Sequence, residues 1–208
     1  MATTRVSESV PNDHKLETTN KMKKIIKEMK HTWVAMGGWL SYFWWGGDPD
    51  EVSPISGLTK REVYVVQKSW APVNANLVAN GTELLIRYFR AYPDAKEYFK
   101  MIRNKSEEEY TANIQFKAHV ISLMTALNLA VVTLNQPELV VVMMNKLGES
   151  HSRRKIKEED FHGLKKVVMK MFVDLLSMDE ATLGAWSKTV DFWYKHAFET
   201  LNSPDGSR

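Results

Sequence analysis

The sequence contains no cysteine. Disulfides, thiolate nucleophiles and cysteine-ligated metals are therefore excluded, and any bound iron or zinc would have to be held by histidine or carboxylate. An excess of charge of one sign is also lacking, since 28 lysines and arginines face 25 acidic residues for a formal charge of +3. This balance does not predict an extended nucleic-acid surface, so nucleic acid is not an expected partner.

Long hydrophobic runs are absent from the amino-terminal part. The first residues have neither the compact apolar core nor the small-residue cleavage site of a secretory signal. The most apolar early segment, residues 33–45, contains Gly37, Gly38 and Ser41 and is shorter than the roughly 20 residues that cross a bilayer. We therefore expect no membrane-spanning segment and a cytoplasmic protein, with partial membrane association left open.

The ends of the chain and its first third differ in composition from the rest. Residues 1–20 and 203–208 are polar and are predicted to be disordered. Residues 21–57 form an extension and linker, in which apolar residues at helical spacing among lysines predict a basic amphipathic helix. This helix could pack on the following domain, or residues 21–45 could contact anionic lipid or a calmodulin-like partner. Residues 36–41 also match the myristoylation pattern, which would act only if translation began at Met36.

Residues 58–202 carry repeated helical signals and no convincing strand pair. Thr59 and Glu62 predict a capping box, and Ser177 and Glu180 predict a second one. Helices are expected over residues 81–92, ending before a proline; over residues 108–134; from residue 137 to about 151; and along an apolar stripe over residues 161–175. The pattern predicts six or more helices in one all-α domain.

Six histidines are present, and spacing alone singles out none of them. Three strings, taken together and in order, are informative. They are LLIRYFRAYPDAKEYF at residues 84–99, FKAHVISLMTAL at residues 116–127 and LGESHSRRKI at residues 147–156. On these strings, residues 58–202 resemble the globin family. The string SKTVDFWYKHAFETL near the carboxyl terminus is similar to intracellular haemoglobins of insects.

The resemblance implies a globin fold of six to eight helices around a haem b pocket, preceded by a helical extension. It places His151 as the proximal iron ligand and His119 on the distal side, where it could also be a sixth ligand. The remaining residues that the resemblance assigns to the pocket are Leu85, Phe99, Phe116, Leu123, Leu147, Lys155, Ile156, Phe161 and Leu164.

The implied function is reversible binding of oxygen and other small gases for storage, transport or buffering. An alternative is oxidation of nitric oxide or reduction of nitrite. Either reaction would need a separate reductase, because the chain has no flavin or nicotinamide motif. A gas sensor acting through the extension, a haem-free scaffold and a homodimer also remain open.

Overall fold

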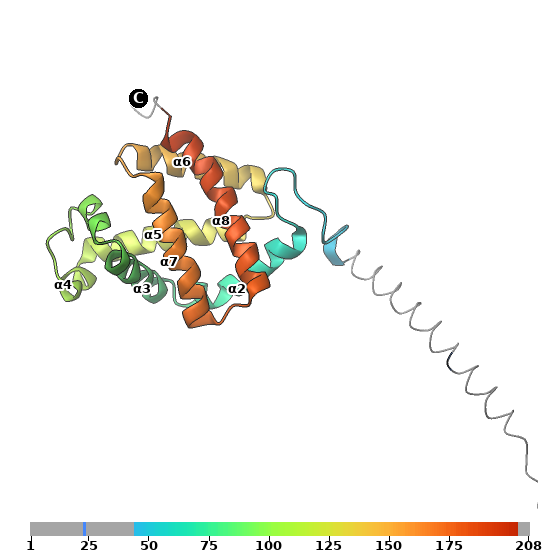
Figure 1. Cartoon of the computed structure of the whole chain (residues 1–208), viewed down its shortest axis with the longest axis horizontal. Helices are drawn as coiled ribbons and strands as arrows, with labels where there is room; N and C mark the ends of the chain where they lie inside the picture. Colours follow the sequence, from blue (N-terminus) through green and yellow to red (C-terminus); the bar gives the residue numbers. More distant parts are fainter. Residues whose placement is uncertain (1–22, 24–43, 204–208) are drawn as a thin grey trace, which may run out of the picture. The chain divides into compact units, whose positions relative to one another are not determined.

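The computed structural model describes residue 23 and residues 44–203 (Figure 1). The chain divides into two compact units at Pro49 and Asp50, and the second of them is described here. Its helices are α2 (Lys60–Ala75), α3 (Leu77–Ala91), the 3₁₀ helix η1 (Pro93–Tyr98), α4 (Glu107–Ala112), α5 (Ile114–Val132), α6 (Pro137–Ser152), α7 (Glu158–Leu176) and α8 (Glu180–Leu201). One isolated antiparallel bridge joins Val52 to Thr59, and no strand occurs among the described residues. The all-α prediction is confirmed.

The predicted extension, residues 21–45, lies outside the described residues except for Lys23 and residues 44–45. The same holds for residues 1–20, for the candidate myristoylation pattern at 36–41 and for all but Ser203 of the predicted tail. These assignments stay predictions.

The start of α2 is the capping box expected from the sequence. The Thr59 hydroxyl accepts a hydrogen bond from the Glu62 amide at 3.1 Å, and the Glu62 carboxylate accepts one from the Thr59 amide at 2.9 Å. Two amides that the helix leaves unpaired are thereby satisfied, which fixes the first residue of the domain's first helix.

The single helix predicted over residues 108–134 is wrong, because two helices, α4 and α5, occupy this stretch. Asn113 separates them in an extended conformation, with φ −68° and ψ 127°. Its side chain accepts hydrogen bonds from the amides of Gln115 and Phe116, at 2.8 and 3.2 Å. An asparagine cap can therefore separate two helices where the sequence has no proline or glycine to signal a break.

Two other helix starts also differ from the prediction. The helix expected from residue 81 already begins at Leu77. The predicted capping box at Ser177 does not form, because Ser177 ends α7 in the left-handed region at φ +48°. Asp179 caps α8 instead, its carboxylate accepting from the Thr182 amide at 2.8 Å. Serine and aspartate are both good N-caps, so residue type alone does not show which of the two caps α8.

Two glycines allow close helix contacts. A Cβ at Gly148 of α6 would collide with the Ala197 carbonyl oxygen of α8. A Cβ at Gly81 of α3 would lie 2.9 Å from Val120 of α5, and would collide with Met124. These close approaches set the spacing of α6 from α8 and of α3 from α5, and so the positions of α5 and α6 in the bundle (Figure 1).

A tryptophan pair lies in the core between α2 and α8. The Trp70 and Trp186 ring centroids are 5.7 Å apart, and the indole N–H groups donate to Asn128 and Ser69, both at 2.9 Å. Beside this pair, residues of α2, α3, α5 and α7 line a partly open, apolar cavity of about 30 Å³, with Met124 and Leu127 of α5 among them. The space is about that of one water molecule, yet its walls are apolar.

One helix in the described part, α5, is long and apolar enough to cross a membrane by length and composition, with a mean hydropathy of 1.3. Core helices pass the same test. Phe116, Val120 and Met124 of α5 are buried in the bundle, which accounts for part of its apolar character.

Candidate haem site

The last turn of α6 carries His151, whose ring is oriented by the helix itself. Nδ1 lies 2.8 Å from the Leu147 carbonyl oxygen and 3.1 Å from the Ser150 hydroxyl. A carbonyl oxygen only accepts, so the proton of the neutral ring belongs on Nδ1 and the lone pair belongs on Nε2. Metal-binding histidines commonly have this arrangement, because the second nitrogen's hydrogen bond fixes both tautomer and ring direction.

Phe161 of α7 packs against the His151 ring, with centroids 5.2 Å apart. Phe161 is buried, and its carbonyl oxygen accepts a hydrogen bond from the Tyr194 hydroxyl of α8 at 2.8 Å. Three helices therefore hold the surroundings of His151 in place.

His119 lies on α5, two turns after the Asn113 cap, and is half-buried. Its ring contacts Phe99, with centroids 4.9 Å apart and planes at 75°. This edge-to-face packing is a favoured aromatic geometry. The structure thus brings together His119 and Phe99, which the resemblance assigns to one pocket.

The pKa values of both histidines are lowered. Burial is the main cause for each, and the positive charge of Arg154 adds to it. For His119 the charge of His151 lowers the pKa further, so the two rings lie near enough to interact. Both imidazoles are therefore mainly neutral at pH 7, which is the form that binds iron.

Haem-free protein is expected to lose stability as the pH falls from 7 towards 5. The folded pKa values of His119 and His151 lie below the ordinary value of 6.5, so the unfolded chain takes up protons first. The stabilisation is complete above the unfolded pKa and is lost as the pH falls through the folded one. Urea unfolding at several pH values measures this. The double variant His119→Gln and His151→Gln should show a shallower fall, and an identical slope would contradict the assignment.

The other assigned residues lie at different depths. Leu85 and Phe116 are buried, and the half-buried ones are Phe99, Leu123, Leu147, Ile156 and Leu164. The Phe116 ring lies 5.1 Å from Tyr110, which places it beside α4. Lys155 is exposed and takes a left-handed conformation at φ +57°, in the turn that follows α6. A pocket role for each of these residues stays a prediction.

Sequence reasoning named Leu147 but not the role of its carbonyl, and it missed two other contributors. The Leu147 carbonyl orients His151, the Tyr194 hydroxyl holds Phe161, and Phe89 of α3 backs Phe99 at 5.1 Å. The first could have been anticipated, since a helix places a residue's carbonyl beside the side chain four positions later. The other two depend on contacts between helices that are far apart in sequence.

No three histidine, aspartate or glutamate side chains gather around a common point in residues 44–203. His119 of α5 and His151 of α6, both neutral, could instead hold a group that supplies its remaining metal donors itself, as haem does. The unprotonated Nε2 of His151 and the apolar rings around both histidines fit such a group.

Comparison with known proteins identifies the fold. The globin family model matches residues 82–196. Cytoglobin-1 of Danio rerio is 31% identical over 154 residues, covering 72% of this chain and 88% of that protein. The solved hexa-coordinate haemoglobin of Drosophila melanogaster has a TM-score of 0.66 and 26% identity, over 72% of this chain and 98% of that one. The myoglobin of Aplysia limacina, at 22% identity, has a TM-score of 0.65 and covers 70% and 99%. With its helices arranged as in these structures and its sequence matched along the domain, this chain belongs to the globin family.

Proposed function

We propose that this globin holds haem b between His119 and His151 and binds oxygen and other small gases reversibly, for storage, transport or buffering of oxygen. The observation that carries the proposal is the Nδ1 hydrogen bond of His151 to the Leu147 carbonyl, 2.8 Å long, which leaves Nε2 available as an iron ligand. Family membership supports the same cofactor.

Bound ferrous haem would supply an iron that takes up a diatomic gas. The protein's part is to hold that group and control its surroundings. His151 offers Nε2 as a neutral donor, while the Phe99 and Phe161 rings exclude water beside the two histidines. Because its pKa is lowered, His119 is neutral at pH 7, and the one ring N–H of a neutral imidazole can donate to a polar ligand.

We further propose that His119 is itself the sixth ligand when no gas is bound. The similarity to the Drosophila protein, which is described as hexa-coordinate, supports this. Ferrous wild-type protein should then give a six-coordinate optical spectrum and His119→Ala a five-coordinate one. If the internal ligand leaves the iron open in about one molecule in ten, the apparent gas affinity falls about ten-fold. His119→Ala removes this ligand, so the variant should bind carbon monoxide about ten-fold more tightly than the wild type.

The matched control is His162→Ala, which removes an exposed histidine of α7. Its spectrum and carbon monoxide affinity should equal those of the wild type. A wild-type ferrous protein that is already five-coordinate contradicts the sixth-ligand proposal but leaves gas binding standing. A protein that shows no haem spectrum after supply of haem contradicts the proposed function as a whole.

A further inference from the structure

A stripe of exposed side chains without charge runs along the outer side of α5. Steps of three and four residues separate its members, so they all lie on one face of the helix. The four large members are each at least 48% exposed, and two smaller side chains lie between them. We call this face the α5 stripe, and in chain order it consists of Ile114, Ala118, Ile121, Thr125, Leu129 and Val132.

The α5 stripe is a continuous surface. Single exposed apolar side chains are ordinary on a protein, whereas a contiguous row of them marks an interaction site. The whole of α5 contains one lysine, Lys117, and no acidic residue. Only 28% of its most apolar 18-residue window is buried, so packing in the bundle accounts for the smaller part of this apolar character.

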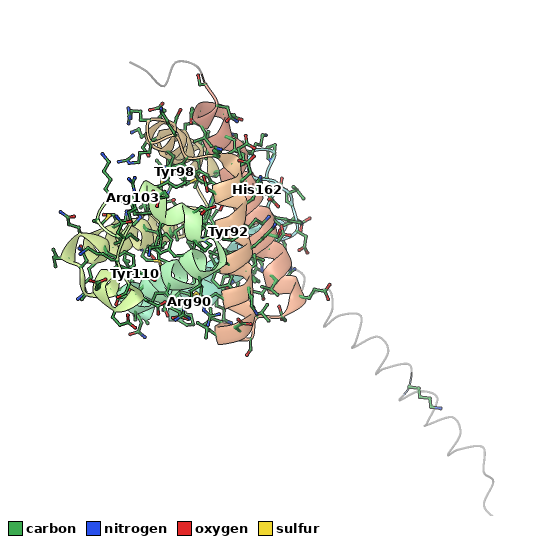
Figure 2. The ribbon with its side chains drawn as sticks, turned by 60° about the vertical axis from the view of Figure 1, so that its left-hand side comes forward. Arg90, Tyr92, Tyr98, Arg103, Tyr110 and His162 are labelled. Atoms are coloured by element: carbon green, nitrogen blue, oxygen red, sulfur yellow. The ribbon has the colours of Figure 1, made fainter. Side chains whose placement is uncertain are left out.

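The charges at the start of the stripe are largely paired within the chain. Arg90 of α3 holds Glu107 of α4 through two hydrogen bonds of 2.9 and 2.6 Å, on the side of the molecule where Tyr110 also lies (Figure 2). The Glu109 carboxylate accepts a hydrogen bond from the Ser106 amide at 2.7 Å. Two of the three acidic side chains of α4 therefore have partners already, and the stripe itself presents mainly apolar groups to a partner.

The lack of charge on the stripe favours one kind of partner. Residues 21–30 of the chain carry five lysines, and a basic segment would need acidic side chains opposite it, of which α5 has none. An anionic lipid surface attracts clusters of lysine and arginine, and this helix offers a single lysine. An uncharged face matches a copy of itself, as the two-fold symmetry of most protein dimers requires.

We propose that the α5 stripe is the interface with a second copy of this chain, in which the two α5 helices pack antiparallel about a two-fold axis level with residue 123. This register sets Ile121 opposite Thr125 of the second copy. Ala118 comes close to Leu129, so small side chains face large ones as interdigitating helices require. The inference goes beyond the proposed function and does not depend on bound haem.

Lys117 determines the antiparallel direction. In a parallel pair the two copies of Lys117 would face each other, and like charges opposite each other are unfavourable. In the antiparallel pair they are twelve residues apart along the helices, or about 18 Å at the helical rise. This distance exceeds the Debye length of about 8 Å at physiological salt, so their repulsion is largely screened.

The size of the stripe predicts a weak dimer. The 19 residues of α5 span about 28 Å, and one helix face of that length covers less than the roughly 800 Å² per partner of a standard interface. We therefore expect association in the micromolar range. Sedimentation equilibrium of the full chain, from low micromolar to submillimolar concentration, measures the dissociation constant.

Ile121→Glu should raise this dissociation constant about 30-fold or more, because it introduces a charge at the centre of the interface. The matched control is Val173→Glu, which alters a similarly exposed residue of α7 and should leave association unchanged. An equal mixture of Ile121→Glu and Ile121→Lys should associate again, since opposite charges then meet across the axis. A wild type that stays monomeric throughout, or an Ile121→Glu variant that associates like the wild type, would overturn the proposal.

The absence of cysteine makes the register directly testable, since an introduced thiol is the only one in the chain. At the helical rise, the two copies of residue 125 lie about 6 Å apart along the helices and those of residue 114 about 27 Å apart. A short bismaleimide should therefore crosslink Thr125→Cys and leave Ile114→Cys monomeric, while a mixture of Ile114→Cys and Val132→Cys should crosslink. Equal crosslinking of Ile114→Cys and Thr125→Cys alone, or none in Thr125→Cys, would contradict the antiparallel interface.

Discussion

Replacing His151 with alanine should remove most of the haem from the purified protein. The substitution deletes the proposed iron ligand, and even the loss of a residue that only orients a ligand costs about 10- to 100-fold in metal affinity, so a fall of about 100-fold or more is expected. The ratio of haem absorbance to protein absorbance after purification with added haem measures retention, and titration of haem into haem-free protein gives the affinity.

Two further variants make the His151 result interpretable. His162→Ala removes an exposed ring that packs on Tyr194 and Phe198, and it should retain haem normally. His151→Gly with added imidazole should regain the wild-type spectrum, because the free base can occupy the vacated place. A His151→Ala protein with a wild-type spectrum and haem affinity would show that another residue binds the iron.

Substituting Gly148 with alanine should lower the free energy of unfolding by about 3 kcal/mol, at the upper end of the usual cost of overpacking a core. The added methyl group would collide with the Ala197 carbonyl oxygen and the Thr200 hydroxyl. The carbonyl belongs to the backbone of α8, so relief requires α6 and α8 to move apart. Chemical unfolding followed by circular dichroism measures the change.

Gly184→Ala is the matched control for this substitution. Gly184 is also a helical glycine, on α8, but a methyl group added there would meet no atom of a neighbouring element within 4 Å. Alanine should therefore raise stability, by up to about 1 kcal/mol, through its better helix propensity. Equal effects of the two substitutions would mean that the α6–α8 contact is not as tight as the structure shows.

Helix ends could be predicted where the local chemistry allowed one solution. The reciprocal bonds of Thr59 and Glu62, the stop before Pro93 and the start at Pro137 were all expected from the sequence and are confirmed. Asn113 was missed because apolar residues continue on both sides of it at helical spacing. At the start of α8 two capping residues compete, and only the tertiary structure shows that Asp179 is the one used.

The candidate site could also be predicted only in part. The resemblance to the globin family points to His119, Phe99, His151 and Phe161, and the structure places them as two ring contacts, one around each histidine. The contacts that place Phe89 of α3 behind Phe99, beside His119 of α5, could not be foreseen, because they depend on how α3 crosses α5. That crossing is set by the small residue Gly81, whose effect appears only when the helices are packed.

The small cavity behind α5 has a mechanical consequence. Met124 and Leu127 line it, and they lie on the same helix as His119. A flexible methionine beside an apolar void can change rotamer at little cost. The core is therefore more compressible beside this face of α5 than elsewhere. Hydrostatic pressure acts first on such voids. The helix that carries His119 therefore has room to yield on this side if that histidine exchanges its partner as proposed.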